Sequence, residues 1–413
     1  MKTAWSETLD PNAILPEYPR PQMVRESYLN LNGVWQYAIA KEGETPEKPA
    51  GDILVPFSPE SELSGVRRML KPKETLWYTR VFTLAEGFNI GRVLLHFGAV
   101  DQTATVYLNG NELGTHTGGY LPFSFDATDS LKEGENTLAV RVRDESDASF
   151  HSRGKQKRKR GGIWYTPQSG IWQTVWCESV PAQYIAALRI TPLFDESSVE
   201  ICAYPQDAEC ALPCIVRIGD VVQHGTAGVP VTVSMEGFKP WSPEHPYLYD
   251  CEVRMGEDCV KSYFGMRKFG VKQDEAGTPR LFLNGKPYFH TGVLDQGYWP
   301  DGLYTAPSDA AMVSDIRAMK EMGFNMLRKH IKVEPLRWYY HCDRLGMIVW
   351  QDMPNGDRGP EWQNRDYFKG TEKNRSEFSE TLYRSEWQAI MDYLYSYPSI
   401  GVWVPFNEAW GQF

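Results

Sequence analysis

The sequence has little that would place it in a membrane, on nucleic acid or in a disordered state. Its apolar runs are short, such as Val93–Leu95, far below the roughly 20 residues of a membrane-spanning helix. Lysine and arginine number 43 against 53 acidic residues, and this net charge of -10 argues against a nucleic-acid partner or a polybasic membrane binder. With 42% hydrophobic and 23% charged residues, the composition predicts a globular chain.

Cysteine is also sparse and shows no ligand spacing. The seven cysteines are scattered and form no Cys-x-x-Cys pair, which gives little support to a zinc or redox site. An odd set of this kind is typical of free thiols in a reducing compartment. The first ten residues contain no apolar segment of a secretory signal. We therefore expect a cytoplasmic protein, or a periplasmic one if its N-terminus was trimmed.

The sequence is rich in aromatic residues, 13% of the chain, and in alternating β patterns. From about residue 34 to 180, short runs such as Trp77–Leu84 and Thr103–Leu108 recur between Gly, Pro and Asp. Asn109-Gly110 follows the second run and predicts a hairpin. These patterns predict a β-sandwich over residues 1–184. A second all-β stretch has the size of an immunoglobulin-like sandwich, which we place at residues 185–272.

After Phe269 the pattern changes to strands that alternate with helices. Asn284-Gly285 predicts another hairpin, and Ser308 or Asp309 is a suitable cap for the first helix. We expect four strands and three helices, with strands at 287–293, 324–327, 347–350 and 400–404 and helices from about 309, 335 and 376. Such repetition predicts parallel strand pairing over residues 273–413.

The last predicted strand runs directly into Asn407-Glu408, with Trp403 and Trp410 on either side. Ligands bind at the carboxyl ends of parallel strands, so a carboxylate here is a candidate catalytic group. Between two indoles Glu408 would be desolvated, and its pKa would rise toward neutrality, as a general acid requires. The alternative is a loop carboxylate beside a helix start, which the dipeptide by itself favours.

Polar and aromatic side chains also end the other three strands of this region. Taken singly, each has a structural interpretation, such as an ion-pair partner, a hydrogen-bonded loop histidine or a turn cap. Four successive strand ends of this kind favour an active-site rim, because charged groups are costly to place there without use. The candidate residues are Asp295, Arg328, His330, Trp350 and Asp352.

A basic run, Lys155-Gln-Lys-Arg-Lys-Arg160, lies between glycines. It suggests nuclear import or polyanion binding, but the net charge of -10 favours a solvated flexible loop. Trp164 and Tyr165 follow it and are equally suited to face a sugar or to pack in a core. We find no cluster of metal ligands and expect neither a metal nor a cofactor.

Ordered motifs along nearly the whole chain carry a resemblance to a known family. They include Trp77-Tyr-Thr-Arg-Val-Phe, Val106-Tyr-Leu-Asn-Gly, Gly118-Gly-Tyr-Leu-Pro-Phe, Ser169-Gly-Ile-Trp, Trp241-Ser-Pro-Glu-His-Pro, Phe264-Gly-Met-Arg, Phe282-Leu-Asn-Gly-Lys-Pro and Asn407-Glu408. Together they resemble glycoside hydrolase family 2, the β-galactosidase and β-glucuronidase family. The resemblance implies a sugar-binding-type jelly-roll sandwich, an immunoglobulin-like sandwich and a (β/α)8 TIM barrel, of which about the first four βα units are here.

The activity that this resemblance implies is that of a retaining β-glycosidase, with galactosides as the expected substrates. Glu408 would be the acid/base, and Asn407 would contact the sugar 2-hydroxyl. Arg328, His330, Asp295, Trp350, Asp352 and Trp410 would line the pocket. The chain departs from the family pattern at Gln296, where many members have histidine, and at His330, which comes one position early.

In relatives of this kind the nucleophile follows the acid/base on a later barrel strand. A barrel needs about 250 residues, and the region after residue 272 is about half as long. We therefore expect the nucleophile to lie outside this chain and the chain to be inactive by itself. The alternative is a non-catalytic carbohydrate-binding or scaffold protein with a remnant barrel. The expected partner is an oligosaccharide or glycoside, with no nucleic acid or membrane and possibly a second copy of the chain.

Overall fold

The first sandwich is formed by two antiparallel sheets in the computed structural model, which describes residues 2–357 and 376–408. One sheet has the order β3 (Gly51–Val55), β2 (Gly33–Lys41), β4 (Glu74–Thr83), β10 (Glu135–Arg143), β7 (Thr103–Leu108), β8 (Asn111–Thr117). The other has the order β1 (Leu29–Asn30), β12 (Val175–Val180), β5 (Arg92–Phe97), β9 (Phe123–Asp126). Apolar residues of both sheets share one buried core.

Shorter elements complete this part of the chain. They are α1 (Ala4–Glu7), the 3-10 turns at Thr128–Ser130 and Ser146–Ala148, and the pair β6 (Val100–Asp101) and β11 (Gly170–Ile171). The predicted hairpin joins β7 to β8, and both Asn109 (φ 53°) and Gly110 (φ 86°) have the left-handed backbone that this turn requires. The prediction of a hairpin is confirmed.

The second sandwich is smaller and has its own core. One sheet has the order β13 (Ile185–Leu193), β14 (Ser198–Pro205), β17 (Val231–Ser234). The other has the order β16 (Val221–Thr226), β15 (Pro213–Ile218), β18 (Tyr249–Met255), β19 (Asp258–Phe264). A separate three-stranded sheet follows, made of β20 (Phe269–Gln273), β21 (Pro279–Leu283) and β22 (Lys286–Pro287). Asn284-Gly285 forms the predicted hairpin turn between β21 and β22.

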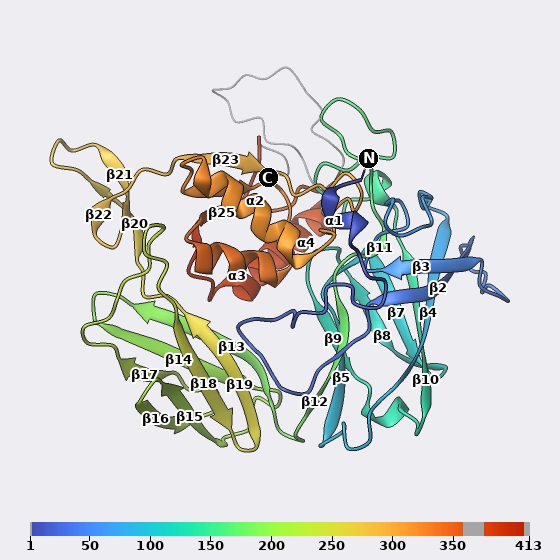
Figure 1. Ribbon diagram of the computed structural model, residues 1–413, viewed down its shortest axis with the longest axis horizontal. Coiled ribbons are helices and arrows are strands. Elements are labelled where there is room, and N and C mark those ends of the chain that lie inside the picture. The colour runs from blue at the N-terminus through green and yellow to red at the C-terminus, as the bar shows by residue number, and fades with distance from the viewer. Residues whose placement is uncertain (1, 358–375, 409–413) are drawn as a thin grey trace.

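The third part is a parallel sheet with helices, which lies above the two sandwiches in Figure 1. Its strands are β23 (Gly292–Asp295), β24 (Met326–Lys329), β25 (Ile348–Asp352) and β26 (Ile400–Val404), paired in that order and all parallel. The helices are α2 (Asp309–Glu321), α3 (Leu336–Leu345) and α4 (Glu377–Leu394). The predicted strand–helix alternation is confirmed, whereas closure into a barrel stays a prediction.

The helix ends follow the sequence signals. Ser308 caps α2, because its hydroxyl accepts a hydrogen bond from the Ala311 amide at 3.1 Å, and Ser376 caps α4 in the same way through Ser379. Gly346 ends α3 in a left-handed conformation at φ 73°. Within the described residues, no helix combines the length and apolarity needed to cross a membrane.

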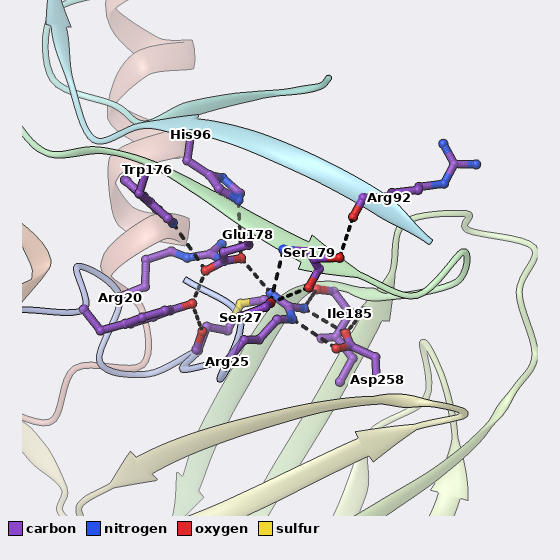
Figure 2. A network of polar contacts seen from close by, with 12 residues as sticks. Arg20, Arg25, Ser27, Arg92, His96, Trp176, Glu178, Ser179, Ile185 and Asp258 are labelled. Carbon is purple, nitrogen blue, oxygen red and sulfur yellow. Dashed lines mark hydrogen bonds and ion pairs between the residues drawn. The ribbon is translucent and has the colours of Figure 1, made fainter. Parts of the chain in front are cut away.

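A buried network of charged residues joins the N-terminal segment to both sandwiches (Figure 2). Arg25 donates to Asp258 at 3.0 and 2.8 Å and to Glu178 at 3.2 Å. Arg20 also pairs with Glu178, and His96 Nε2 lies 3.3 Å from the same carboxylate. We call these five residues the interface network. It fixes the first sandwich, which holds Glu178 and His96, against the second, which holds Asp258.

Candidate active site

Four of the predicted site residues meet at the carboxyl end of the parallel sheet. Arg328, on β24, donates to both carboxylate oxygens of Asp352 on β25, each at 2.9 Å. Its NH2 also donates to the Asn407 amide oxygen, just beyond β26, at 3.0 Å. His330 Nδ1 lies 3.1 Å from Asp352 Oδ2. We call Arg328, Asp352, Asn407 and His330 the site network.

The site network forms because side chains alternate along each strand. Register pairs Arg328 with Trp350, so both lie on one face of the sheet, and Asp352 follows on that face two residues later. Trp350 Nε1 donates to His290 Nδ1 at 2.8 Å. His290 precedes β23 and was not among the predicted residues, because no strand-end pattern marks it.

Asp295 does not join the site network. It pairs in register with Lys329, whose Nζ lies 2.9 Å from Asp295 Oδ2 and 2.8 Å from Glu334. Lys329 is buried between the sheet and the helices, so these residues face away from Arg328. They border a cavity of about 350 Å³ that Met312 of α2 and Trp338 of α3 also line. The predicted substrate-binding role of Asp295 stays a prediction, and its side chain lies on the opposite face of the sheet from the site network.

The surroundings of Glu408 differ from those expected. Asn407 is buried, but Glu408 is exposed and adopts a positive φ of 50°. Trp403 does not shield it, because this indole pairs in register with Gln351 on the helix-facing side and packs against Trp387 of α4 at 5.6 Å. Trp410 lies outside the described residues. The expected desolvation of Glu408 is therefore not what the structure has.

Several buried polar atoms around this end of the sheet have no hydrogen-bond partner within residues 2–357 and 376–408. They include His330 Nε2 and both amide atoms of Asn355, whose side chain is only 1% exposed. Leaving such atoms unpaired costs free energy, so their presence points to a place for polar ligand groups. Asn355 was missed by the sequence predictions, although it follows β25 by three residues. No group of metal-ligating side chains is found among the described residues.

The first sandwich contributes a wall to this end of the sheet. The loop between β10 and β11 reaches the loop after β25, where the amides of Arg153 and Gly154 donate to the Asn355 carbonyl at 2.7 and 2.9 Å. Gly154 has a φ of 63°, and a Cβ at this position would lie 2.6 Å from the Tyr304 hydroxyl. The close approach of the two parts of the chain therefore requires glycine here.

Comparison with known proteins places these features in a family context. Residues 55–172 match the family described as glycosyl hydrolase 2 galactose-binding domain-like, and residues 216–267 match glycosyl hydrolases family 2. A putative β-glucuronidase of Formosa agariphila is 27% identical over 358 residues, covering 80% of this chain and 39% of that protein. A β-galactosidase of Thermoanaerobacter pseudethanolicus is 25% identical over 315 residues, covering 70% and 41%.

Solved structures agree on the fold. The β-glucuronidase of an uncultured Clostridium superposes with a TM-score of 0.75 at 21% identity, covering 94% of this chain and 70% of that one. A β-galacturonidase of Eisenbergiella tayi superposes with a TM-score of 0.71 at 21% identity, covering 95% and 66%. The chain thus spans about two fifths of the two sequence relatives and about two thirds of the solved chains.

Proposed function

We propose that the chain, which belongs to glycoside hydrolase family 2, is a glycosidase-like enzyme and supplies the acid/base half of a retaining β-glycosidase. The observation that carries this proposal is the bridge that Arg328 makes between Asp352 and Asn407. It holds the residue before Glu408 in one orientation at the carboxyl end of the sheet. Groups held in this way contribute to catalysis by positioning.

The roles of the two adjacent residues follow from their surroundings. The exposed Glu408 carboxyl protonates the glycosidic oxygen as the bond to the sugar breaks, and the carboxylate then takes a proton from water in the second step. Arg328 occupies the amide oxygen of Asn407, which leaves the amide NH2 group to donate to a sugar hydroxyl.

A retaining mechanism also needs a nucleophilic carboxylate about 5–5.5 Å from the acid/base. The carboxylate of the site network, Asp352, is already held by Arg328 and His330, so we do not assign it this role. We propose that the nucleophile comes from outside this chain, and that the 413 residues by themselves do not turn over. Asp352 then orients Arg328 rather than attacking the sugar.

We propose β-galactosides as substrates, and relatives named for β-glucuronides define the competing choice. The test is a panel of nitrophenyl β-galactoside, β-glucuronide and β-mannoside, given to the protein that contains this chain. We expect turnover of the galactoside and its loss in Glu408→Gln. The matched control is Glu26→Gln. The Glu26 side chain is 91% exposed and pairs with Lys261 of the second sandwich.

The outcomes separate the alternatives. Preference for the glucuronide would contradict the sugar assignment but not the role of Glu408. Equal activity of Glu408→Gln and the native protein would contradict the acid/base assignment. Sugar binding with no hydrolysis of any glycoside would favour the non-catalytic carbohydrate-binding protein. Turnover by residues 1–413 alone would show that the nucleophile lies within them.

A further inference from the structure

The loop between β10 and β11 carries a group of five positive charges with one acidic partner among the described residues. We call residues 155–160 the basic finger, and its cations are Lys155, Lys157, Arg158, Lys159 and Arg160. It lies in the green loop that projects beside the label N in Figure 1. Across residues 2–357 and 376–408, one acidic side chain forms an ion pair with the finger: Asp147, which accepts from Arg158 Nε at 2.7 Å. A chain of net charge -10 thus concentrates positive charge at one place.

The start of the basic finger is fixed to the loop that follows β25. The Arg153 and Gly154 amides donate to the Asn355 carbonyl, and Ser152 forms a β-bridge with Gly356. Ser152, Arg153 and Gly154 are all buried. Asn355 follows Asp352 of the site network by three residues. The first cation, Lys155, therefore begins immediately beside the carboxyl end of β25.

The chain just after the basic finger is fixed to the loop that follows β23. Tyr165 stacks on Tyr298, with ring centroids 3.9 Å apart and planes 10° apart. Within the finger, Lys157 Nζ lies 4.0 Å from the Trp164 ring centroid. The Tyr165 amide also donates to the Lys155 carbonyl at 2.9 Å, which closes the loop on itself. The sequence favoured a solvated loop, but these contacts attach the run to two strand ends of the candidate site.

We propose that the basic finger binds the carboxylates or sulfates of an acidic polysaccharide whose end occupies the candidate site. This inference rests on the proposed glycosidase function, which puts a glycan at this end of the sheet. Clustered cations at a site entrance attract an anionic substrate and raise its association rate. Beside these cations lie the half-buried rings of Trp164, which contacts Lys157, and Tyr165, which stacks on Tyr298. A long nucleic acid is disfavoured, because the other parts of the chain are acidic overall.

The test measures binding of labelled heparin, hyaluronan and neutral dextran to the full chain at several salt concentrations. Heparin carries sulfate and carboxylate, whereas hyaluronan carries carboxylate alone. Comparing the two therefore shows which anionic group the basic finger binds. The variant is Lys155→Gln/Lys159→Gln/Arg160→Gln, which spares the cations held by Trp164 and Asp147. The control, Lys132→Gln/Lys272→Gln/Lys286→Gln, removes the same charge from exposed sites outside the finger.

We expect at least one acidic polysaccharide to bind and dextran not to bind. The finger variant should weaken binding about tenfold at low salt, and the slope of log K against log salt should fall by about 2 for three lost contacts to a flexible polyanion. The control variant should bind like the native chain.

Three results would overturn the proposal. They are equal weakening by the control variant, binding of dextran as tight as that of the acidic polymers, and tighter binding of single-stranded oligothymidylate than of either acidic polysaccharide. Binding requires no turnover, so failure of the proposed function would show itself separately, as no hydrolysis of the small nitrophenyl glycosides.

Discussion

Arg25 in the interface network and Arg328 in the site network each bridge two partners, yet their surroundings differ. Arg25 lies between Glu178 and Asp258 with a side chain 4% exposed, and Glu178 is 0% exposed. Arg328 also binds a fully buried carboxylate, Asp352, but its own side chain is 29% exposed. The bridge made by Arg25 is enclosed by protein, whereas the bridge made by Arg328 is partly exposed on the face of the sheet. We call the interface network closed and the site network open.

This difference distinguishes a structural ion pair from one arranged for a ligand. In the closed network every charge is balanced internally: burial alone would raise the pKa of Glu178, but Arg20, His96 and Arg25 bring it well below its ordinary value. In the open network, His330 Nε2 has no hydrogen-bond partner in the part of the chain that the structure describes, while Nδ1 lies beside Asp352. A buried nitrogen with spare hydrogen-bonding capacity, near the partly exposed Arg328, is suited to a polar substrate.

The largest expected effect comes from removing charge in the closed network. Glu178→Gln leaves Arg20 and Arg25 buried with too little compensating charge, and should lower the free energy of unfolding by about 3–5 kcal/mol. Urea denaturation measures this change. Glu26→Gln, which breaks a pair of exposed side chains with Lys261, should leave the midpoint unchanged. A Glu178→Gln protein as stable as the native one would contradict the structural role of this network.

The open network should respond mainly in activity. Asp352→Asn removes the charge that orients Arg328 and, through it, Asn407. In the protein that also supplies the nucleophile, kcat/KM should fall about 100-fold, while the free energy of unfolding falls by about 2 kcal/mol. Asp295→Asn is the matched control, because it breaks an ion pair at the same sheet edge but on the opposite face. Equal losses of activity in both variants would show that the two faces are not functionally distinct.

The smallest effect concerns the pH dependence of stability. Burial, and next the charge of Arg20, lower the pKa of His96 to about 4. The unfolded chain therefore takes up a proton near pH 6.5 that the folded chain takes up only near pH 4, and stability is lost as pH falls between these values. His96→Phe, which can keep the stack on Trp176, should make this loss shallower by up to about 1.4 kcal/mol per pH unit. Thermal unfolding from pH 4 to 7 compares the two, and identical slopes would contradict the assignment.

The sequence predicted the features that depend on local chemistry. The Asn-Gly turns, the Ser308 cap and the strand–helix alternation all follow from residues close together in the chain. The strand predicted at 324–327 instead runs from Met326 to Lys329. Asn325 lies before it, and its side-chain oxygen accepts a hydrogen bond from the Thr291 amide. The sequence therefore indicated at which end of the sheet the site lies more reliably than the first and last residue of each strand.

Features that depend on distant contacts were beyond such prediction. Arg25 and Glu178 are 153 residues apart, and no pattern in the sequence links them. Strand ends alone do not give the phase of the side chains, so the sequence could not show that Asp295 faces away from Arg328. The basic finger looked like a solvated loop because its anchors, Asn355 and Tyr298, lie on strand ends far along the chain.

The central claim is that Glu408 is the acid/base of a retaining site, and azide rescue tests it most directly. In Glu408→Ala of the protein that also supplies the nucleophile, the glycosyl-enzyme forms from a nitrophenyl glycoside with a good leaving group, but water lacks its base in the second step. Azide needs no base, so it should restore turnover and yield a glycosyl azide of retained β configuration. An unrescued variant, or an α-glycosyl azide product, would contradict the account.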